Sequence, residues 1–214
     1  MDKMLKKYYA DRALEYDKIY LKPERQSDLR KLENIISTAY TGMNVLEIAC
    51  GTGYWTKEIA KNAISILGID CNKVVLDIAK YRKVQKGSVS FQIADAYKLD
   101  NINKHFNAGY CGFWYSHIPK LERNKFLNIF HSKLLPDSKV IMLDNRYVAG
   151  SSTPVSRIDS NGDSYQSREL EDGSLHEVLK NFPSKDELYK TYKNISQKLE
   201  IHFLEYYWLI MYNT

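Results

Sequence analysis

Two glycines, and an acid just before them, are the residues of this 214-residue sequence that most clearly predict chemistry. Gly51 and Gly53 follow a short apolar run at 43–49, and Glu47 lies inside that run. Glycine has no side chain and tolerates positive φ, so a turn of this kind between a strand and a helix lets a ligand approach the backbone. The first amides of the following helix can then receive a negative charge. The turn therefore predicts a ligand site.

Polar side chains also stand where later apolar runs end. Asp70, Asp95 and Asp144 end three such runs, and His117 follows a fourth. If the runs are parallel strands, their carboxyl ends share one edge of the sheet, which is where open α/β sheets bind ligands. Ionised carboxylates accept strong hydrogen bonds from hydroxyl groups. These residues therefore predict a polar ligand at that edge.

Short apolar runs alternate with stretches of helical spacing, and this alternation predicts the fold. We expect an α/β fold with a doubly wound, mostly parallel seven-stranded sheet, whose edge carries an antiparallel C-terminal hairpin from the aromatic segment 201–212. The right-handed crossovers of such a sheet place helices on both faces. We expect the other strands over 43–49, 64–69, 89–93, 108–114 and 140–143, the helices over 27–40, 54–62, 73–81, 121–135 and 185–199, and a turn at 136–138.

The length fits one domain, 1–214, in three parts. Residues 1–40 form an N-terminal helical cover, and 43–145 form the ligand-binding core. Residues 148–182 are a polar insert, with a hairpin turn predicted at Asn161-Gly162. An insert of this length is usually functional or disordered, and we expect a partly ordered lid or pocket wall.

The charge and the cysteines exclude several classes of protein. The net charge is +5, but lysines and arginines are interleaved with acids, so the pattern does not favour nucleic acid as a partner. Cys50, Cys71 and Cys111 form no CxxC pair and have no companion histidine cluster, so neither a disulfide scaffold nor a metal site is expected. With no apolar signal or membrane-length segment, we expect a cytoplasmic monomer or homodimer that does not bind membranes.

The segment from Glu47 to Gly53 resembles the first motif of class I S-adenosylmethionine-dependent methyltransferases, E-x-G-x-G-x-G, with Ala49 in place of the first glycine. The resemblance covers roughly residues 43–145. It implies a Rossmann-like fold, S-adenosylmethionine as cofactor and S-adenosylhomocysteine as product. The cofactor contacts that it implies are Glu47, Ala49, Cys50, Gly51, Gly53, Asp70, Cys71, Asp95, Ala96 and Gly112.

In that family, an acid after the second strand binds the ribose hydroxyls, which matches Asp70. The end of the third strand, here Asp95-Ala96, contacts the adenine amino group. Glu47 would orient the ammonium group of the cofactor, directly or through water. A dinucleotide-binding protein is the competing interpretation, but it would need G-x-G-x-x-G. The third glycine is absent, and Trp55 would crowd a pyrophosphate.

The acceptor of the methyl group is less well defined. The segment 112–119 lacks the N-P-P-Y motif that family enzymes use for amino nitrogens of nucleic acids. His117 is the candidate catalytic base or substrate contact, and a structural histidine is the alternative. Aromatic rings can attract the sulfonium, and the polar composition after Asp144 suggests a polar or anionic acceptor. The expected substrate contacts are Tyr16, Tyr20, Trp114, Tyr115, Arg146 and Arg168.

Three functions follow from these observations. The first is transfer of a methyl group to an oxygen or nitrogen of a small, polar molecule. The second is methylation of RNA or protein, which the basic balance of charge suggests. The third is a non-catalytic module that binds the cofactor and acts through a partner.

Overall fold

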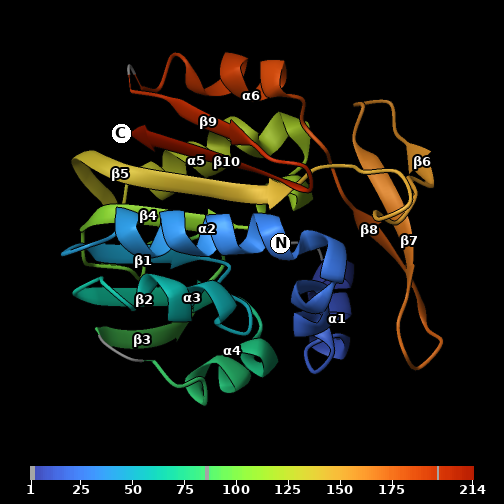
Figure 1. Ribbon diagram of the computed structural model, residues 1–214, viewed down its shortest axis with the longest axis horizontal. Helices are drawn as coiled ribbons and strands as arrows, with labels where there is room; N and C mark the ends of the chain where they lie inside the picture. The colour runs from blue at the N-terminus through green and yellow to red at the C-terminus, as the bar shows by residue number, and fades with distance from the viewer. Residues whose placement is uncertain (1–2, 85–86, 197) are drawn as a thin grey trace.

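The central sheet has seven strands in the order β3-β2-β1-β4-β5-β10-β9 (Figure 1). The computed structural model describes residues 3–84, 87–196 and 198–214. The first five strands are parallel, β10 runs antiparallel to β5, and β9 runs antiparallel to β10. This confirms the predicted sheet and its edge hairpin. The strands are β1 (Asn44–Ile48), β2 (Ser65–Asp70), β3 (Ser88–Ile93), β4 (Phe106–Gly112), β5 (Leu134–Asn145), β9 (Glu200–Phe203) and β10 (Tyr207–Asn213).

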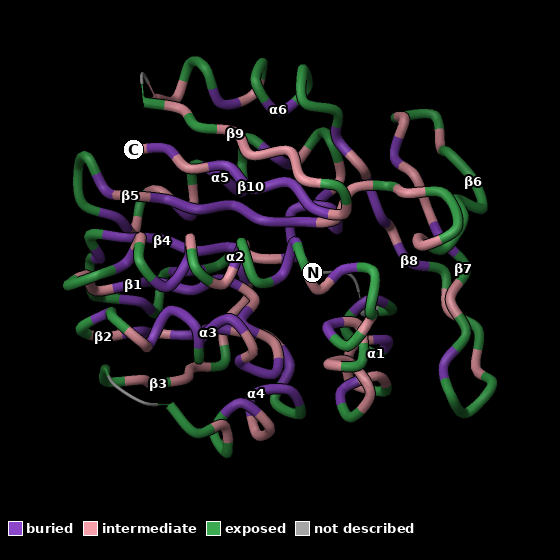
Figure 2. Tube along the Cα trace, viewed as in Figure 1, coloured by how far each residue is buried: buried purple, intermediate pink, exposed green. Residues whose placement is uncertain are grey.

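Helices cover both faces of this sheet because its central strands are apolar on both sides. Neighbouring residues of β1 point in opposite directions: Val45 belongs to the apolar cluster that includes α2 and α3, whereas Leu46 belongs to the one that includes α5 and α6. Figure 2 shows the burial concentrated along these strands. The helices are α2 (Gln26–Ala39), α3 (Tyr54–Ile59), α4 (Lys73–Lys80), α5 (Arg123–His131) and α6 (Lys185–Tyr192).

Several predicted boundaries differ from the observed ones. The helix expected over 121–135 ends at His131, and β5 begins at Leu134, which pairs with Phe106. The expected turn at 136–138 is instead an irregularity within β5, where the register shifts and Asp137 adopts φ 59°. The last helix ends at Tyr192 rather than at 199, because Asn194 and Ser196 favour turns. Residue 197 of that expected helix lies outside the described residues.

Two further parts stand at the carboxyl edge of the parallel strands (Figure 1). The cover expected over 1–40 begins with α1 (Lys3–Asp11) and the 3-10 helices η1 (Tyr16–Leu21) and η2 (Pro23–Arg25), and residues 1–2 lie outside the described part. The insert forms a separate antiparallel sheet of β6 (Arg157–Ile158), β7 (Ser164–Glu169) and β8 (Leu175–Leu179).

The turn at Asn161-Gly162 joins β6 to β7, with Ile158 paired to Ser164 and Gly162 at φ 77°. The small sheet is thus an ordered wall that packs against α1. Within the described residues, no helix combines the length and the apolar composition that crossing a membrane requires.

Candidate functional site

A left-handed turn joins β1 to α3. Ala49, Gly51 and Gly53 have φ of 52°, 54° and 76°. A Cβ atom at Gly53 would lie 3.1 Å from the Cβ of Ala79, so glycine lets the turn approach α4. Ala49 stands where the motif has glycine, and it adopts a conformation that costs an L-residue about 1–2 kcal/mol. The turn therefore keeps its shape at the expense of backbone strain.

Asp70, the last residue of β2, holds this turn in place. Its Oδ2 accepts a hydrogen bond from the Gly51 N–H at 3.1 Å, and its Oδ1 accepts one from the Asn72 N–H at 2.8 Å. Burial raises the pKa of Asp70, and these N–H donors act in the opposite direction. The cap of α4 is Asn72, whose side chain accepts from the Val74 N–H. The Asp70 carboxylate therefore remains at the strand edge rather than serving as that cap.

The first cavity lies beside this turn. Seven of the ten expected cofactor contacts line it, namely Ala49, Gly51, Asp70, Cys71, Asp95, Ala96 and Gly112. Its remaining lining residues are Tyr9, Tyr16, Thr52, Asn72, Val75, Ala94, Phe113, Trp114 and His117. Trp114 is 6% exposed, and its indole Nε1 has no hydrogen-bond partner among the residues described. A buried donor of this kind is costly unless a ligand accepts its hydrogen bond.

Three of the expected contacts lie outside this lining. Glu47 is buried beneath the turn, where Thr56 donates its hydroxyl to Oε2 at 2.6 Å. Burial raises the pKa of Glu47 to about 8. Cys50 is buried as well, and Gly53 is the N-cap residue just before α3. Glu47 therefore supports the turn from beneath, Cys50 and Gly53 are part of the turn itself, and none of the three lines the cavity.

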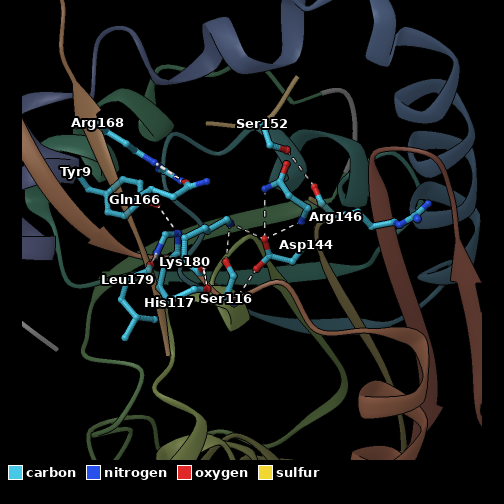
Figure 3. A network of polar contacts seen from close by, with 12 residues as sticks. Tyr9, Ser116, His117, Asp144, Arg146, Ser152, Gln166, Arg168, Leu179 and Lys180 are labelled. Carbon is cyan, nitrogen blue, oxygen red and sulfur yellow. Dashed lines mark hydrogen bonds and ion pairs between the residues drawn. The ribbon is translucent and has the colours of Figure 1, made fainter. Parts of the chain in front are cut away.

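His117 ends the 3-10 helix η3 (Tyr115–His117), which follows β4. Its Nδ1 lies 2.6 Å from the Leu179 carbonyl oxygen, which can only accept, so Nδ1 carries the proton. In the neutral ring Nε2 is then an acceptor, and the Tyr9 hydroxyl donates to it at 2.7 Å (Figure 3). Burial lowers the pKa of His117 well below its usual value, and the charges of Lys180 and Arg168 lower it further. His117 is therefore neutral, and its lone pair is already engaged.

A buried ion pair lies next to His117. Lys180, which follows β8, donates to the Asp144 Oδ1 at 2.8 Å and to the Ser116 hydroxyl at 2.5 Å (Figure 3). The second oxygen of Asp144 accepts the Ser116 N–H at 2.9 Å. Burial lowers the pKa of Lys180 to about 8, against the attraction of Asp144. These bonds tie the small sheet to the ends of β4 and β5.

The second cavity, of about 340 Å³, lies between α1, the 3-10 helices and the small sheet. Tyr9, Tyr16, Phe113 and His117 line both cavities, so the two spaces meet at these side chains. Phe113 adopts φ 59°, a strained conformation for a bulky residue. The cationic residues that line the second cavity are Arg12, Lys18, Lys22, Arg25, Arg168 and Lys180.

Half of the expected substrate contacts line these cavities, namely Tyr16, Trp114 and Arg168. The other three lie elsewhere, and the geometry does not support a contact role for them. Tyr20 stacks on the ring of Tyr54 at 3.8 Å, and Tyr115 is buried beneath Arg123. Arg146 lies over Phe203, with 4.1 Å to the ring centroid, and donates to the Leu204 carbonyl. Their aromatic and cationic character serves packing instead.

The sequence pattern does not identify several residues that line the cavities, namely Thr52, Asn72, Phe113, Arg12, Lys22 and Arg25. The signal for Arg12 was present, since it follows Tyr8 and Tyr9 at the helical spacing that puts side chains on one face. The positions of Lys22 and Arg25 depend on the chain passing from η1 to η2, which periodicity does not reveal.

Comparison with known proteins adds to this geometry. Residues 45–137 match a family described as the methyltransferase domain. Over 57 residues the chain is 37% identical to the magnesium-protoporphyrin O-methyltransferase of Rhodobacter capsulatus, which is 26% of this chain and 25% of that protein. Over 83 residues it is 26% identical to a ubiquinone biosynthesis O-methyltransferase of Coxiella burnetii, which is 38% of this chain and 36% of that protein. The matched segments thus span about a quarter to a third of these relatives.

Solved structures resemble the chain over nearly its whole length. The structure described as the DhpI-SAM-HEP complex has a TM-score of 0.79 at 22% identity, covering 99% of this chain and 98% of that one. The DhpI-SAH complex has a TM-score of 0.77 at 22% identity, covering 97% and 94%. At this level of identity the likeness establishes a shared fold, and it includes the cover and the insert.

Proposed function

Since the chain belongs to the class I S-adenosylmethionine-dependent methyltransferases, we propose that it transfers a methyl group from this cofactor to an oxygen or nitrogen of a small, polar molecule. The observation that carries the proposal is the meeting of two cavities. The first is lined by the motif turn and the strand-end acids, and the second adjoins it at Tyr9, Tyr16, Phe113 and His117. A donor in one and an acceptor in the other would face each other there.

The residues of the first cavity fit the cofactor. Asp70 offers a carboxylate to the ribose hydroxyls, and the buried Trp114 Nε1 is a donor that a polar group of the ligand would satisfy. The rings of Tyr9 and Tyr16 line the same space and would attract a cationic sulfur. When bound, S-adenosylmethionine supplies a methyl group on that sulfur, ready for direct displacement.

The protein's contribution to this step is mainly orientation. Phe113 and His117 line both cavities where they adjoin, and the Tyr9 hydroxyl holds α1 against His117. A proton leaving the acceptor could pass to the Tyr9 oxygen only as Tyr9 gives its own proton to His117 Nε2. His117 is a weak base here, because burial and two nearby cations disfavour its charged form.

The size of the second cavity favours a small acceptor over RNA or protein. About 340 Å³ lies within the range of sites for small molecules, and residues of α1 and the small sheet line the cavity. Catalysis rather than cofactor binding alone is favoured because the two cavities adjoin, with Tyr9, Tyr16, Phe113 and His117 lining both.

Calorimetry with S-adenosylhomocysteine, and mass spectrometry of a metabolite pool incubated with S-adenosylmethionine, test the proposal. We expect Asp70→Ala to weaken S-adenosylhomocysteine binding by about 1.5–3 kcal/mol, the range for a hydrogen bond to a charged group. The matched control is Asp77→Ala, which removes an exposed carboxylate from α4. Equal affinity in Asp70→Ala and the wild type would contradict the ribose assignment, and bound cofactor with no methylated product would favour the non-catalytic module.

A further inference from the structure

The cationic residues of the second cavity lack acidic partners. Within the described chain, Arg12, Lys22, Arg25 and Arg168 form no ion pair within 4 Å. Lys18 pairs with Glu171, and Lys180 pairs with Asp144. The acids that line the cavity themselves are Glu15 and Glu169. The cavity therefore carries an excess of positive charge.

Neutral groups hold these unpaired cations. Arg168 donates to the Gln166 Oε1 at 2.7 Å and to the Tyr8 hydroxyl at 3.3 Å. Arg12 donates to the same hydroxyl at 2.8 Å. Two guanidinium groups thus converge on Tyr8 at one wall of the cavity.

Arg25, at the end of η2, also lines the second cavity. It is only 7% exposed, and it donates hydrogen bonds to the Ser151 hydroxyl and to the Asn145 Oδ1. Lys22 donates to the Ser151 carbonyl. A buried cation held only by neutral acceptors is costly, and an anion in the cavity would offset that cost.

The described side chains near His117 also offer no free base to accept a proton. Both nitrogens of His117 are engaged, Nδ1 with the Leu179 carbonyl and Nε2 with the Tyr9 hydroxyl. Lys180 and Asp144 form a buried ion pair close to His117, and they neutralise each other. Where the two cavities meet, no described side chain is therefore both basic and free to take a proton from an acceptor.

We propose that the acceptor is a small molecule bearing an oxyanion, that Arg168 and Arg12 bind this group, and that its ionised oxygen receives the methyl group. The inference rests on the proposed function. A lone pair of the ionised oxygen forms the new O–C bond, the C–S bond of the methyl sulfonium breaks, and its electron pair stays on sulfur. No proton moves, so no base is required. The shared chemistry is an oxyanion, which a phosphate or a carboxylate can supply.

Titration calorimetry of protein saturated with S-adenosylhomocysteine tests this. The probes are phenyl phosphate, benzoate and neutral benzyl alcohol, which share an aromatic ring and differ in charge. We expect an anionic probe to bind one site per chain and benzyl alcohol to bind at least tenfold more weakly. A preference for phenyl phosphate would identify a phosphate-type group, and a preference for benzoate would identify a carboxylate.

Arg168→Met should lower the affinity of the preferred anion about 10- to 100-fold. Arg157→Met is the matched control: it removes the same charge from the same small sheet, at a residue paired with exposed Glu177. Equal binding of all three probes, or equal loss in both variants, would overturn the inference. The protein must first bind S-adenosylhomocysteine before the probes are added. If the proposed function is wrong, the protein will not bind S-adenosylhomocysteine, and this result is distinct from a failure of the anionic probes to bind.

Discussion

Single residues set the shape of the turn that begins the site. Ala49, Gly51 and Gly53 are all left-handed, and Asp70 holds the middle of the turn through the Gly51 N–H. The sequence motif identifies the two glycines, whereas the strain at Ala49 becomes visible only in the backbone. Because alanine replaces the motif's first glycine, the left-handed backbone at position 49 destabilises the folded protein.

Replacing Ala49 with glycine should stabilise the protein. Relief of the left-handed alanine is worth about 1–2 kcal/mol, and the added freedom of glycine in the unfolded chain costs about 0.5–1 kcal/mol. We therefore expect Ala49→Gly to raise the free energy of unfolding by about 0.5–1 kcal/mol in urea titrations. Ala39→Gly, at the end of α2 and outside the left-handed region, should instead lower it by up to about 1 kcal/mol. A loss of stability in both variants would show that Ala49 is not strained.

At the level of elements, α1 closes the site through two hydrogen-bonded tyrosines. The Tyr9 hydroxyl donates to His117 at the end of η3, and the Tyr8 hydroxyl accepts a hydrogen bond from Arg168 of β7. Partners 108 and 160 residues apart along the chain thus meet over the cavities. Both contacts attach a short helix, which has little stability of its own, to rigid parts of the fold.

Tyr9→Phe should loosen α1. The variant keeps the ring but leaves the buried Nε2 of His117 without its donor, a loss of about 1 kcal/mol. We expect the amides of α1 to exchange with deuterium about fivefold faster, while the amides of β1 and β4 keep their protection. Tyr81→Phe, at an 89% exposed ring after α4, is the control. Unchanged exchange in α1 would mean that its docking depends on Tyr8 and apolar packing instead.

The elements also show what the sequence could predict. The parallel strands are short apolar runs with helical spacing between them, so the sheet and its carboxyl edge follow from pattern alone. The small sheet does not, because β7 reads S-Y-Q-S-R-E and pairs through its backbone with β8, without an apolar run. The Tyr9–His117 bond and the cations at Lys22 and Arg25 depend on where α1 and the 3-10 helices dock. That docking joins distant segments, which local periodicity does not encode.

At the level of the whole molecule, the residues that form the core of the sheet and the residues that line the candidate site lie in different places. Its interior is apolar on both faces, and the polar groups of the site gather at one edge, between the parallel core and the walls formed by α1 and the small sheet (Figures 1 and 2). Glu47 is the exception, since it is an acid inside the β1 strand with 1% exposure and Thr56 as its hydrogen-bond partner. Its titration should therefore affect the stability of the whole fold.

We expect Glu47 to make the cofactor-free protein less stable as pH rises. Burial raises its folded pKa to about 8, from an ordinary value of 4.5. A carboxyl with a raised folded pKa contributes its full stability below the unfolded pKa, and this contribution is lost as pH rises through the folded pKa. Between about pH 5 and 8 the unfolding free energy of the wild type should therefore fall relative to Glu47→Gln, by roughly 1.4 kcal/mol per pH unit at most.

Urea titrations of both proteins across this range measure that difference, in which all other titrating groups cancel. The glutamine of the Glu47→Gln variant keeps the shape of the side chain and a partner for the Thr56 hydroxyl, but it cannot ionise, so its advantage should grow with pH. Asp100→Asn, at an exposed turn position, should follow the wild type at every pH. Parallel curves for Glu47→Gln and the wild type would mean that Glu47 ionises at its ordinary pKa in the folded protein. In that case a charge beneath the turn would already be available to orient the cofactor's ammonium group, and the supporting role inferred from its burial would have to be abandoned.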